Sequence, residues 1–291
     1  MTKHLSASRS YIGYREEDHS SPFSPYYDPM MAPLPSHVVE ALNLGPRAVP
    51  LLTSIEKAGD LLSSDSVAVE TGYTLLPDGS MTVAVLTHMP DVTPAMWDWW
   101  FTWHGDDTRK YKLWHPQAHV AVQWSDTKHT PGPRSYIGRT SFVEEYLGHR
   151  LTRAAIRFLP PSELGLDEDE IADPQQATVI CARVGFSCHP LDAGYLLHHV
   201  RKTHDGSEMR SRFWIGGRHA ALRTRSKALN RALPSLTTMA MPMTAQRASE
   251  LLVHCAQEMA HLAVILPSLH ATFACAENQT PFSVSDGATS L

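Results

Sequence analysis

The chain has 291 residues, of which 43% are hydrophobic and 19% charged, a balance that suits a globular protein with a sizeable buried core. Its net charge of −5 gives no reason to expect nucleic acid or an anionic membrane as a partner. No apolar stretch reaches the roughly 20 residues that span a bilayer, and the N-terminus has no apolar signal region. We therefore expect a soluble, cytoplasmic protein.

Histidine is the outlier in the composition, with 17 residues, and it is the commonest metal ligand in proteins. The four cysteines are Cys181, Cys188, Cys255 and Cys275. None of them forms a C-x-x-C pair, so neither a zinc ribbon nor a thioredoxin-type motif is present, and we expect buried free thiols.

The first 65 residues predict an N-terminal arm followed by a helical extension. Residues 1–35 are polar and rich in Ser, Pro and Tyr, which favours an irregular arm lying on the body of the protein or on a neighbouring subunit. Residues 35–64 carry apolar side chains at helical spacing. Strand-like runs at 66–76 and 81–89 flank the turn sequence LPDGS, which predicts a β-hairpin.

Thr93 and Pro94 then fit the N-cap and the first position of a short helix. Apolar and β-branched runs predict further strands at residues 118–124, 140–147, 153–158, 178–187, 194–203 and 208–215. Residues 216–243 resemble a loop or lid with some helix. Apolar spacing over 244–266 predicts a long helix ended by Pro267, and we expect residues 276–291 to form a flexible tail.

Many antiparallel strands followed by one long helix indicate the α+β class. In such a fold the sheet curves around the helix and leaves a cavity between them. The C-terminal helix carries His254 and Glu258, which lie one turn apart on one face and can chelate a single metal ion. A solvent-facing pair of this kind is also common on helix surfaces.

Three other motifs offer polar side chains to the interior. Within YKLWHPQAH, Pro116 restricts His115 to an extended or turn conformation, either at a cavity edge or in a loop shielded by Trp114. Adjacent residues of a strand face opposite ways. One of Glu144 and Glu145 therefore faces inward, where an unpaired carboxylate is costly.

The same argument applies to His198 and His199 on the strand over 194–203, of which one should face inward. The alternative for both strand motifs is an exposed, charged surface.

Four motifs in order resemble the family of 2,4-diacetylphloroglucinol hydrolases and phloretin hydrolases. They are YKLWHPQAH, VEEYLG, HHVR followed by GSEMRSRFW, and H-x-x-x-E on the last helix. The similarity covers about residues 70–265. It implies a helix-grip fold, like that of Bet v 1 and START domains, with a catalytic domain over residues 66–275. It also implies an N-terminal extension that contributes to the contacts of a homodimer.

The resemblance implies a bound zinc ion, or another divalent metal, and hydrolysis of the carbon–carbon bond between an acyl group and a phloroglucinol-type ring. The substrate would be a small aromatic polyphenol ketone. The implied metal ligands are His115, Glu145, His254 and Glu258. Glu144 is the alternative to Glu145, and the catalytic histidine that would act beside Glu145 is His198 or His199.

Ala118 and Phe213 depart from the family pattern, because they stand where polar residues are expected to hold the substrate's hydroxyl groups. This departure bears on the substrate preference more than on the reaction. Two other functions fit the same fold: a non-enzymatic carrier of an apolar ligand, without bound metal, and a metal-dependent ester or amide hydrolase. No nucleophile elbow, phosphate-binding loop or dinucleotide-binding glycine motif occurs in the sequence.

Overall fold

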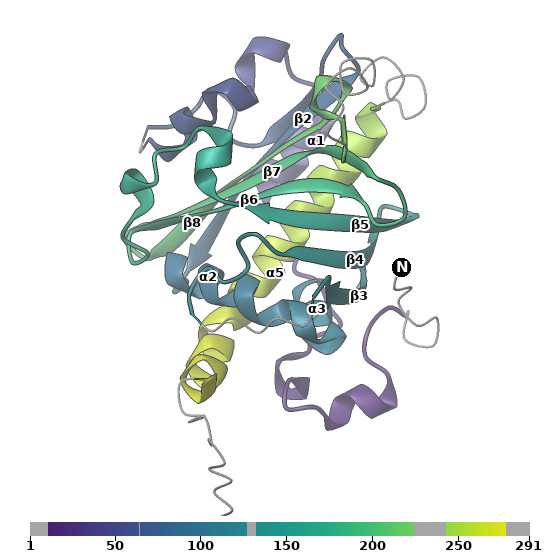
Figure 1. The fold of residues 1–291 in the computed structure, drawn as a ribbon, viewed down its shortest axis with the longest axis vertical. Helices are drawn as coiled ribbons and strands as arrows, with labels where there is room; N and C mark the ends of the chain where they lie inside the picture. The colour runs from purple at the N-terminus through teal and green to yellow at the C-terminus, as the bar shows by residue number, and fades with distance from the viewer. Residues whose placement is uncertain (1–10, 64, 127–131, 224–242, 278–291) are drawn as a thin grey trace, which may run out of the picture.

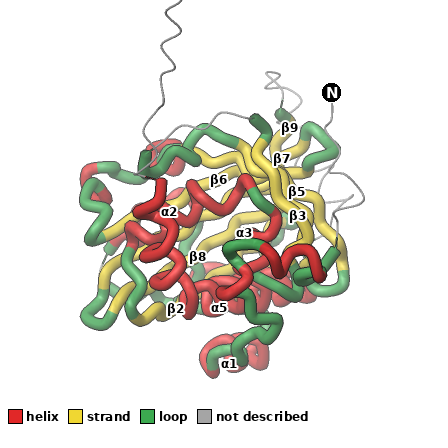
Figure 2. Tube along the Cα trace, turned by 90° about the horizontal axis from the view of Figure 1, so that it is seen from below, coloured by secondary structure: helices red, strands yellow, loops and turns green. Residues whose placement is uncertain are grey.

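The computed structural model describes residues 11–63, 65–126, 132–223 and 243–277 (Figure 1). Residues 278–291 of the expected flexible tail over 276–291, and most of the expected loop or lid over 216–243, lie outside these residues; residues 276–277 belong to a helix. Within them, the architecture is a single curved sheet with one long helix across it and shorter helices at its margins (Figures 1 and 2).

The described residues form a sheet of nine antiparallel strands in the order β1-β2-β8-β7-β6-β5-β4-β3, with β9 added beside β7. The strands are β1 (Gly72–Leu75), β2 (Ser80–Pro90), β3 (His119–Trp124), β4 (Thr140–Leu147), β5 (Arg150–Leu159), β6 (Ala177–Phe186), β7 (Leu191–Lys202), β8 (Gly206–Gly216) and β9 (Ala221–Leu222). Apart from the two-residue β9, every strand was predicted, and most bounds agree within a few residues, although β1 begins at Gly72 and not at the expected residue 66. The predicted β1–β2 turn is confirmed, and Gly79 adopts a φ of 80° there, which its missing Cβ permits.

The described helices pack on one side of the sheet or at its ends. They are α1 (Ser36–Leu44), α2 (Pro94–Trp103), α3 (Thr108–Trp114) and α5 (Ala245–Glu277). Short 3-10 turns are η2 (Glu16–Ser20), η3 (Ser24–Tyr26), η4 (Val49–Leu51), η5 (Ile55–Leu62), η6 (His104–Asp106), η7 (Pro161–Leu164), η8 (Asp169–Ile171) and η9 (Gly217–His219). The predicted cap of α2 is confirmed, since the Thr93 hydroxyl accepts a hydrogen bond from the Met96 amide. The sequence pattern did not predict α3.

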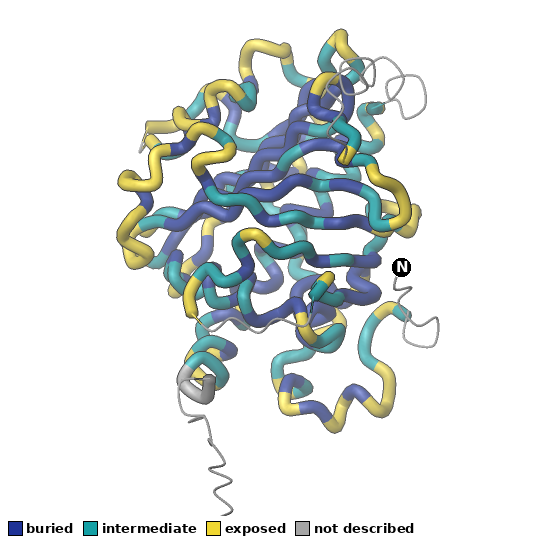
Figure 3. Tube along the Cα trace, in the orientation of Figure 1, coloured by how far each residue is buried: buried dark blue, intermediate teal, exposed yellow. Residues whose placement is uncertain are grey.

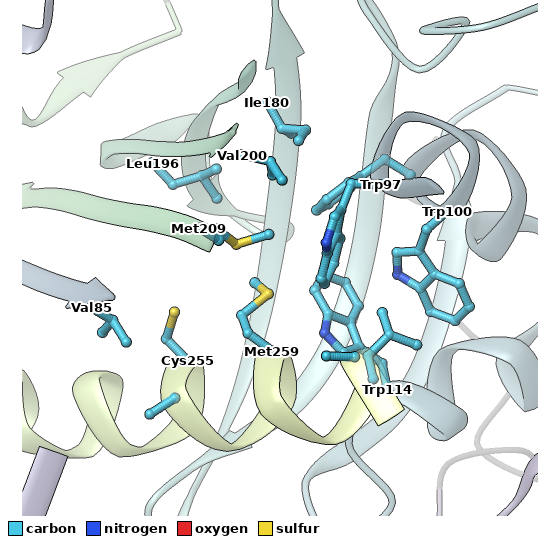
Figure 4. Packing of buried hydrophobic residues seen from close by; sticks show 14 of the residues in the cluster. Val85, Trp97, Trp100, Trp114, Ile180, Leu196, Val200, Met209, Cys255 and Met259 are labelled. Atoms are coloured by element: carbon cyan, nitrogen blue, oxygen red, sulfur yellow. The ribbon is translucent and has the colours of Figure 1, made fainter. Parts of the chain in front are cut away.

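Helix α5 crosses the concave face of the sheet, behind strands β4 to β8 in the view of Figure 1. This arrangement is the expected α+β helix grip. Cys255 and Met259 point from α5 towards Met209 and Val200 on the sheet, while Trp97, Trp100 and Trp114 fill the space beside them (Figure 4). The strands of the grip are largely buried along their length (Figure 3).

Pro267 does not end α5, contrary to the sequence-based prediction, and the helix continues to Glu277. A proline inside a helix costs about 3 kcal/mol, because it removes a hydrogen bond and crowds the preceding turn. Packing beyond Pro267 offsets this cost. Leu269 is fully buried, and the Phe273 ring lies 5.3 Å from the Trp103 ring and 5.4 Å from the Phe23 ring.

The N-terminal arm lies on the body of the same chain. Lys112 donates a hydrogen bond of 2.7 Å to the Gly13 carbonyl, and the Tyr14 hydroxyl donates one of 2.8 Å to the Arg109 carbonyl. Tyr26 reaches the far end of α5, with its hydroxyl 2.6 Å from that of Thr272. The arm therefore covers α3 and the C-terminal end of α5.

By length and hydropathy alone, residues Ala245–Ala274 of α5 are apolar enough to cross a membrane, which the sequence-based estimate of apolar run lengths had not anticipated. In the structure, 56% of the 18-residue apolar window within this helix is buried inside the protein. Packing against the concave face of the sheet therefore accounts for the apolar character of this helix. Cys181 and Cys255 are buried as expected, whereas Cys188 is exposed.

Candidate metal centre

Four imidazole and carboxylate side chains converge inside the grip from three separate elements. His119 begins β3, Glu145 lies on β4, and His254 and Glu258 lie on α5. His119 Nε2 is 3.4 Å from Glu258 Oε2 and 3.8 Å from Glu145 Oε2. His254 Nε2 is 3.7 Å and 3.9 Å from the same two oxygens. The buried group of His119, His254 and Glu258 can hold a metal ion.

Local structure explains why these residues meet. His119 and Glu145 are direct cross-strand partners in the β3–β4 register, so their side chains share one face of the sheet. On β4, the lining of the cavity includes Val143, Glu145 and Leu147, the alternation predicted for one face of that strand. His254 and Glu258 are one turn apart on α5 and face this pair across the grip.

His119 is prepared to act as a ligand. Its Nδ1 lies 2.9 Å from the Tyr111 carbonyl, and because a carbonyl can only accept, Nδ1 carries the proton. The lone pair is then on Nε2, which is buried and has no hydrogen-bond partner in the structure. A buried nitrogen acceptor left without a donor is costly, and a metal ion removes that cost.

Tyr111 supports both members of the cross-strand pair. Its hydroxyl donates a hydrogen bond of 2.5 Å to Glu145 Oε2, and its ring stacks on the His119 ring at 3.8 Å with an angle of 5°. Glu145 and His119 therefore have their orientations set by one aromatic residue on α3, as the outer partners of metal ligands commonly do.

Burial governs the ionisation of the group. It raises the pKa of Glu258 well above its usual value, with the charge of Glu145 adding to the effect, and it raises the pKa of Glu145 as well. Burial lowers the pKa of His119 well below 6.5, with His254 adding to the effect, and lowers that of His254 to about 4. Two carboxylates in such a site resist ionising together unless a cation compensates them, whereas the imidazoles stay neutral with free lone pairs.

The donor set fits a divalent metal. Zinc binds imidazole nitrogen and carboxylate oxygen at about 2.0–2.2 Å, so donors at the corners of a tetrahedron are roughly 3.3 Å apart. The four nitrogen–oxygen distances found here, 3.4 to 3.9 Å, are close to that spacing.

Of the expected ligands, Glu145, His254 and Glu258 meet in this group, whereas His115 lies beside it and His119 takes part instead. His115 is the C-cap residue of α3, and its ring stacks on the His254 ring with 4.9 Å between ring centres. The turn from His115 to His119 carries the chain from the helix into β3, so only His119 gains the strand register that faces Glu145. The sequence did not indicate His119, because the β3–β4 register that sets it opposite Glu145 shifts between His119 and Ala121.

Within each of the pairs Glu144/Glu145 and His198/His199, the two side chains lie on opposite faces of the sheet. Glu144 points away from the group and pairs with Arg153 at 2.9 Å, whereas Glu145 points into it. His199 lies on the opposite face of the sheet from the cavity, with Nδ1 2.9 Å from the Leu61 carbonyl of η5. His198 faces the cavity instead.

A cavity of about 480 Å³ lies beside the group, and its lining includes Glu145, His254 and Glu258. His198 also lines this cavity and is buried. Its Nδ1 lies 2.8 Å from the hydroxyl of Ser211, its direct cross-strand partner on β8. Most of the remaining lining is apolar or aromatic. Phe213 lines the cavity, as the family resemblance implied. Ala118 does not line it, because this residue lies in the turn that precedes β3.

Fold and site together define a helix-grip protein with a buried histidine–glutamate group beside a ligand-sized cavity. Residues 51–271 match the family model of the DAPG hydrolase PhiG domain. The chain is 30% identical over 263 residues to a 2,4-diacetylphloroglucinol hydrolase of Pseudomonas protegens, covering 87% of this chain and 85% of that protein. It is 28% identical over 268 residues to a phloretin hydrolase of Eubacterium ramulus, covering 89% and 93%.

These matches show that the chain belongs to the 2,4-diacetylphloroglucinol hydrolase family. Among solved structures, Ara h 8.0201 aligns with 60% of this chain and 98% of its own at 10% identity and a TM-score of 0.30. A protein of Chromobacterium violaceum aligns with 66% of this chain and 99% of its own at 10% identity and a TM-score of 0.35.

Proposed function

We propose that this chain is a metal-dependent hydrolase that cleaves the carbon–carbon bond between an acyl group and a phloroglucinol-type ring. The products are the free phloroglucinol and a carboxylic acid. The observation that carries the proposal is the group of His119, Glu145, His254 and Glu258 beside the cavity, in a family whose relatives are named for such substrates. A cavity of about 480 Å³ suits a small aromatic ketone.

Zinc is the metal we propose, because two imidazoles and two carboxylates suit it, and elemental analysis separates it from iron, manganese or cobalt. His119, Glu145, His254 and Glu258 would hold it. When bound, such an ion supplies Lewis-acid polarisation of the acyl carbonyl or an activated water.

The bond cannot break directly, since an aryl carbanion is too basic to leave. Moving a proton from a ring hydroxyl to the acylated ring carbon gives a ketone tautomer, in which the scissile bond belongs to a β-diketone. Water then adds to the acyl carbonyl, and the ring departs as an enolate. One water is consumed, with its hydroxyl ending on the acid and its hydrogen on the ring.

The residues of the cavity suit these steps. Burial lowers the pKa of His198 to about 3, so at neutral pH its imidazole is uncharged and would pass a proton on without retaining it as a stable imidazolium. We assign to His198 the transfer of the proton from the ring hydroxyl to the ring carbon. Tyr111 keeps Glu145 oriented, and apolar side chains such as Phe213 exclude bulk water from the reacting bond.

The test combines metal content with turnover. His254→Ala and Glu258→Ala should each lose the bound metal and, with it, release of phloroglucinol from phloretin and 2,4-diacetylphloroglucinol, by on the order of 100-fold or more. Metal is measured by elemental analysis, and the products by chromatography. His270→Ala is the matched control, because His270 is on the same helix but contacts Trp99 at 5.3 Å between ring centres. It should keep metal and activity.

A metal-free variant that still turns over would refute the metal dependence. Purified protein that binds phloretin without metal and without cleavage would favour the carrier. Cleavage of esters or amides but of neither ketone would favour the alternative hydrolase.

A further inference from the structure

A second hollow, of about 320 Å³, borders the group of His119, Glu145, His254 and Glu258, which we call the metal group. We call it the outer groove. It lies between α1, the turn from His115 to Ala118, the end of β4 and α5. Its lining residues are Leu42, His115, Gln117, Ala118, Tyr146, Gly148, Ser249, Glu250, Val253, His254 and Gln257. Of these, the outer groove shares only His254 and Glu250 with the substrate cavity. The His254 side chain therefore borders both spaces.

The two spaces differ in chemistry. The substrate cavity is lined mainly by apolar and aromatic side chains. Such side chains offer a cation few ligands to replace the water molecules of its hydration shell. The outer groove presents the amide of Gln257 and the hydroxyl of Ser249, and it shares with the substrate cavity the carboxylate of Glu250, which lies 3.8 Å from Arg150. Oxygen ligands of this kind can replace the waters of a divalent ion one at a time.

His115 connects the outer groove to the metal group. It is 3% exposed, and its Nδ1 has no hydrogen-bond partner in the structure. Its ring lies parallel to that of His254, with 4.9 Å between ring centres and an angle of 20°, and 5.5 Å from that of His119. A buried imidazole with an unused nitrogen is costly to maintain. Its place beside two candidate ligands, but outside their group, calls for a role other than permanent coordination.

We propose that the outer groove is the path by which the metal enters and leaves, with His115 as a transient ligand that passes the ion to His254. The proposal rests on the metal dependence proposed above. In this arrangement the metal and the substrate use different routes, because the substrate reaches the metal group from the apolar cavity. A bound substrate would then leave the exchange path open.

The test follows zinc exchange in the full-length, zinc-loaded protein, with transfer to excess chromophoric chelator recorded over time. His115→Phe keeps an aromatic ring against His254 but removes the nitrogen. It should retain one zinc per chain at equilibrium and slow the transfer about tenfold or more. Val253→Trp, which fills the outer groove, should slow it similarly. Leu151→Trp is the matched control, because Leu151 is a partly exposed lining residue of the substrate cavity, and its exchange rate should stay unchanged.

Four results would overturn the proposal. Wild-type rates in both His115→Phe and Val253→Trp would exclude the path, and slower exchange in Leu151→Trp alone would assign it to the substrate cavity. Loss of zinc from His115→Phe at equilibrium would make His115 a permanent ligand. A wild-type chain that takes up no zinc would remove the metal centre itself, whereas a loaded wild type with unaffected variants would remove only the exchange path.

Discussion

Ser211 is the residue that holds His198 in place. The two residues face each other across β7 and β8, and Ser211 is fully buried with its hydroxyl 2.8 Å from His198 Nδ1. The same hydroxyl also interacts with the Cys255 thiol on α5. Ser211 thus fixes which nitrogen of His198 is left free, a detail that proton transfer depends on.

Ser211→Ala should lower kcat for acylphloroglucinol cleavage by about tenfold and leave KM nearly unchanged, since one hydrogen bond of about 1.4 kcal/mol is lost without altering the cavity shape. Steady-state kinetics measure both constants. Ser211→Thr, which keeps the hydroxyl, should restore part of the rate, and Ser207→Ala, a buried serine on the same strand, serves as control. A change confined to KM would speak against a positioning role.

At the scale of elements, helix α2 is tied to the sheet by one buried carboxylate. Asp98 is 2% exposed, and its Oδ1 accepts hydrogen bonds of 2.8 Å from Tyr136 and from Thr178 of β6. Arg134 lies 3.7 Å from the same oxygen. This contact holds the helix that supplies Phe101 to the cavity wall.

Asp98→Ala should reduce the free energy of unfolding by roughly 2–4 kcal/mol, because it leaves two buried hydroxyl donors without an acceptor. Urea unfolding of the two proteins measures the difference. Asp60→Ala, at an exposed position in η5, should change it by no more than about 0.5 kcal/mol. Equal losses in the two variants would contradict the anchoring role.

The whole molecule buries several neutral histidines, which makes its stability depend on pH. Four that lie away from the metal group and its neighbour His115 are His104, His198, His199 and His219. Burial lowers the pKa to about 3 for His198 and to about 4 for the other three. In the unfolded chain these pKa values return to about 6.5, so between pH 6.5 and 4 the unfolded state binds more protons.

The free energy of unfolding should therefore fall as the pH drops from 7 to 5, by about 2 kcal/mol at pH 5 for each of these histidines. Urea midpoints of the metal-free protein at pH 7, 6 and 5 measure the trend. His199→Gln, which retains a donor for the Leu61 carbonyl, should make the decline shallower. Midpoints that do not move with pH would mean that these imidazoles are not buried in the neutral form.

Sequence by itself determined the strands, the class of fold and the two candidate ligands on α5, because each follows from local periodicity. Alternation placed Glu144 and Glu145 on opposite faces, and helical spacing placed His254 and Glu258 together. The same local reasoning misjudged Pro267, since packing of Leu269 and Phe273 outweighs the preference of proline.

Only the tertiary structure decided which of two equivalent side chains faces the cavity and which histidine joins the metal group. Those choices depend on strand register and on the side of the sheet that α5 covers, and both are set by contacts between residues far apart in the chain. His119 meets Glu145 because β3 pairs with β4 in one register, and His198 meets the cavity because η5 covers the face that carries His199. No local pattern contains that information.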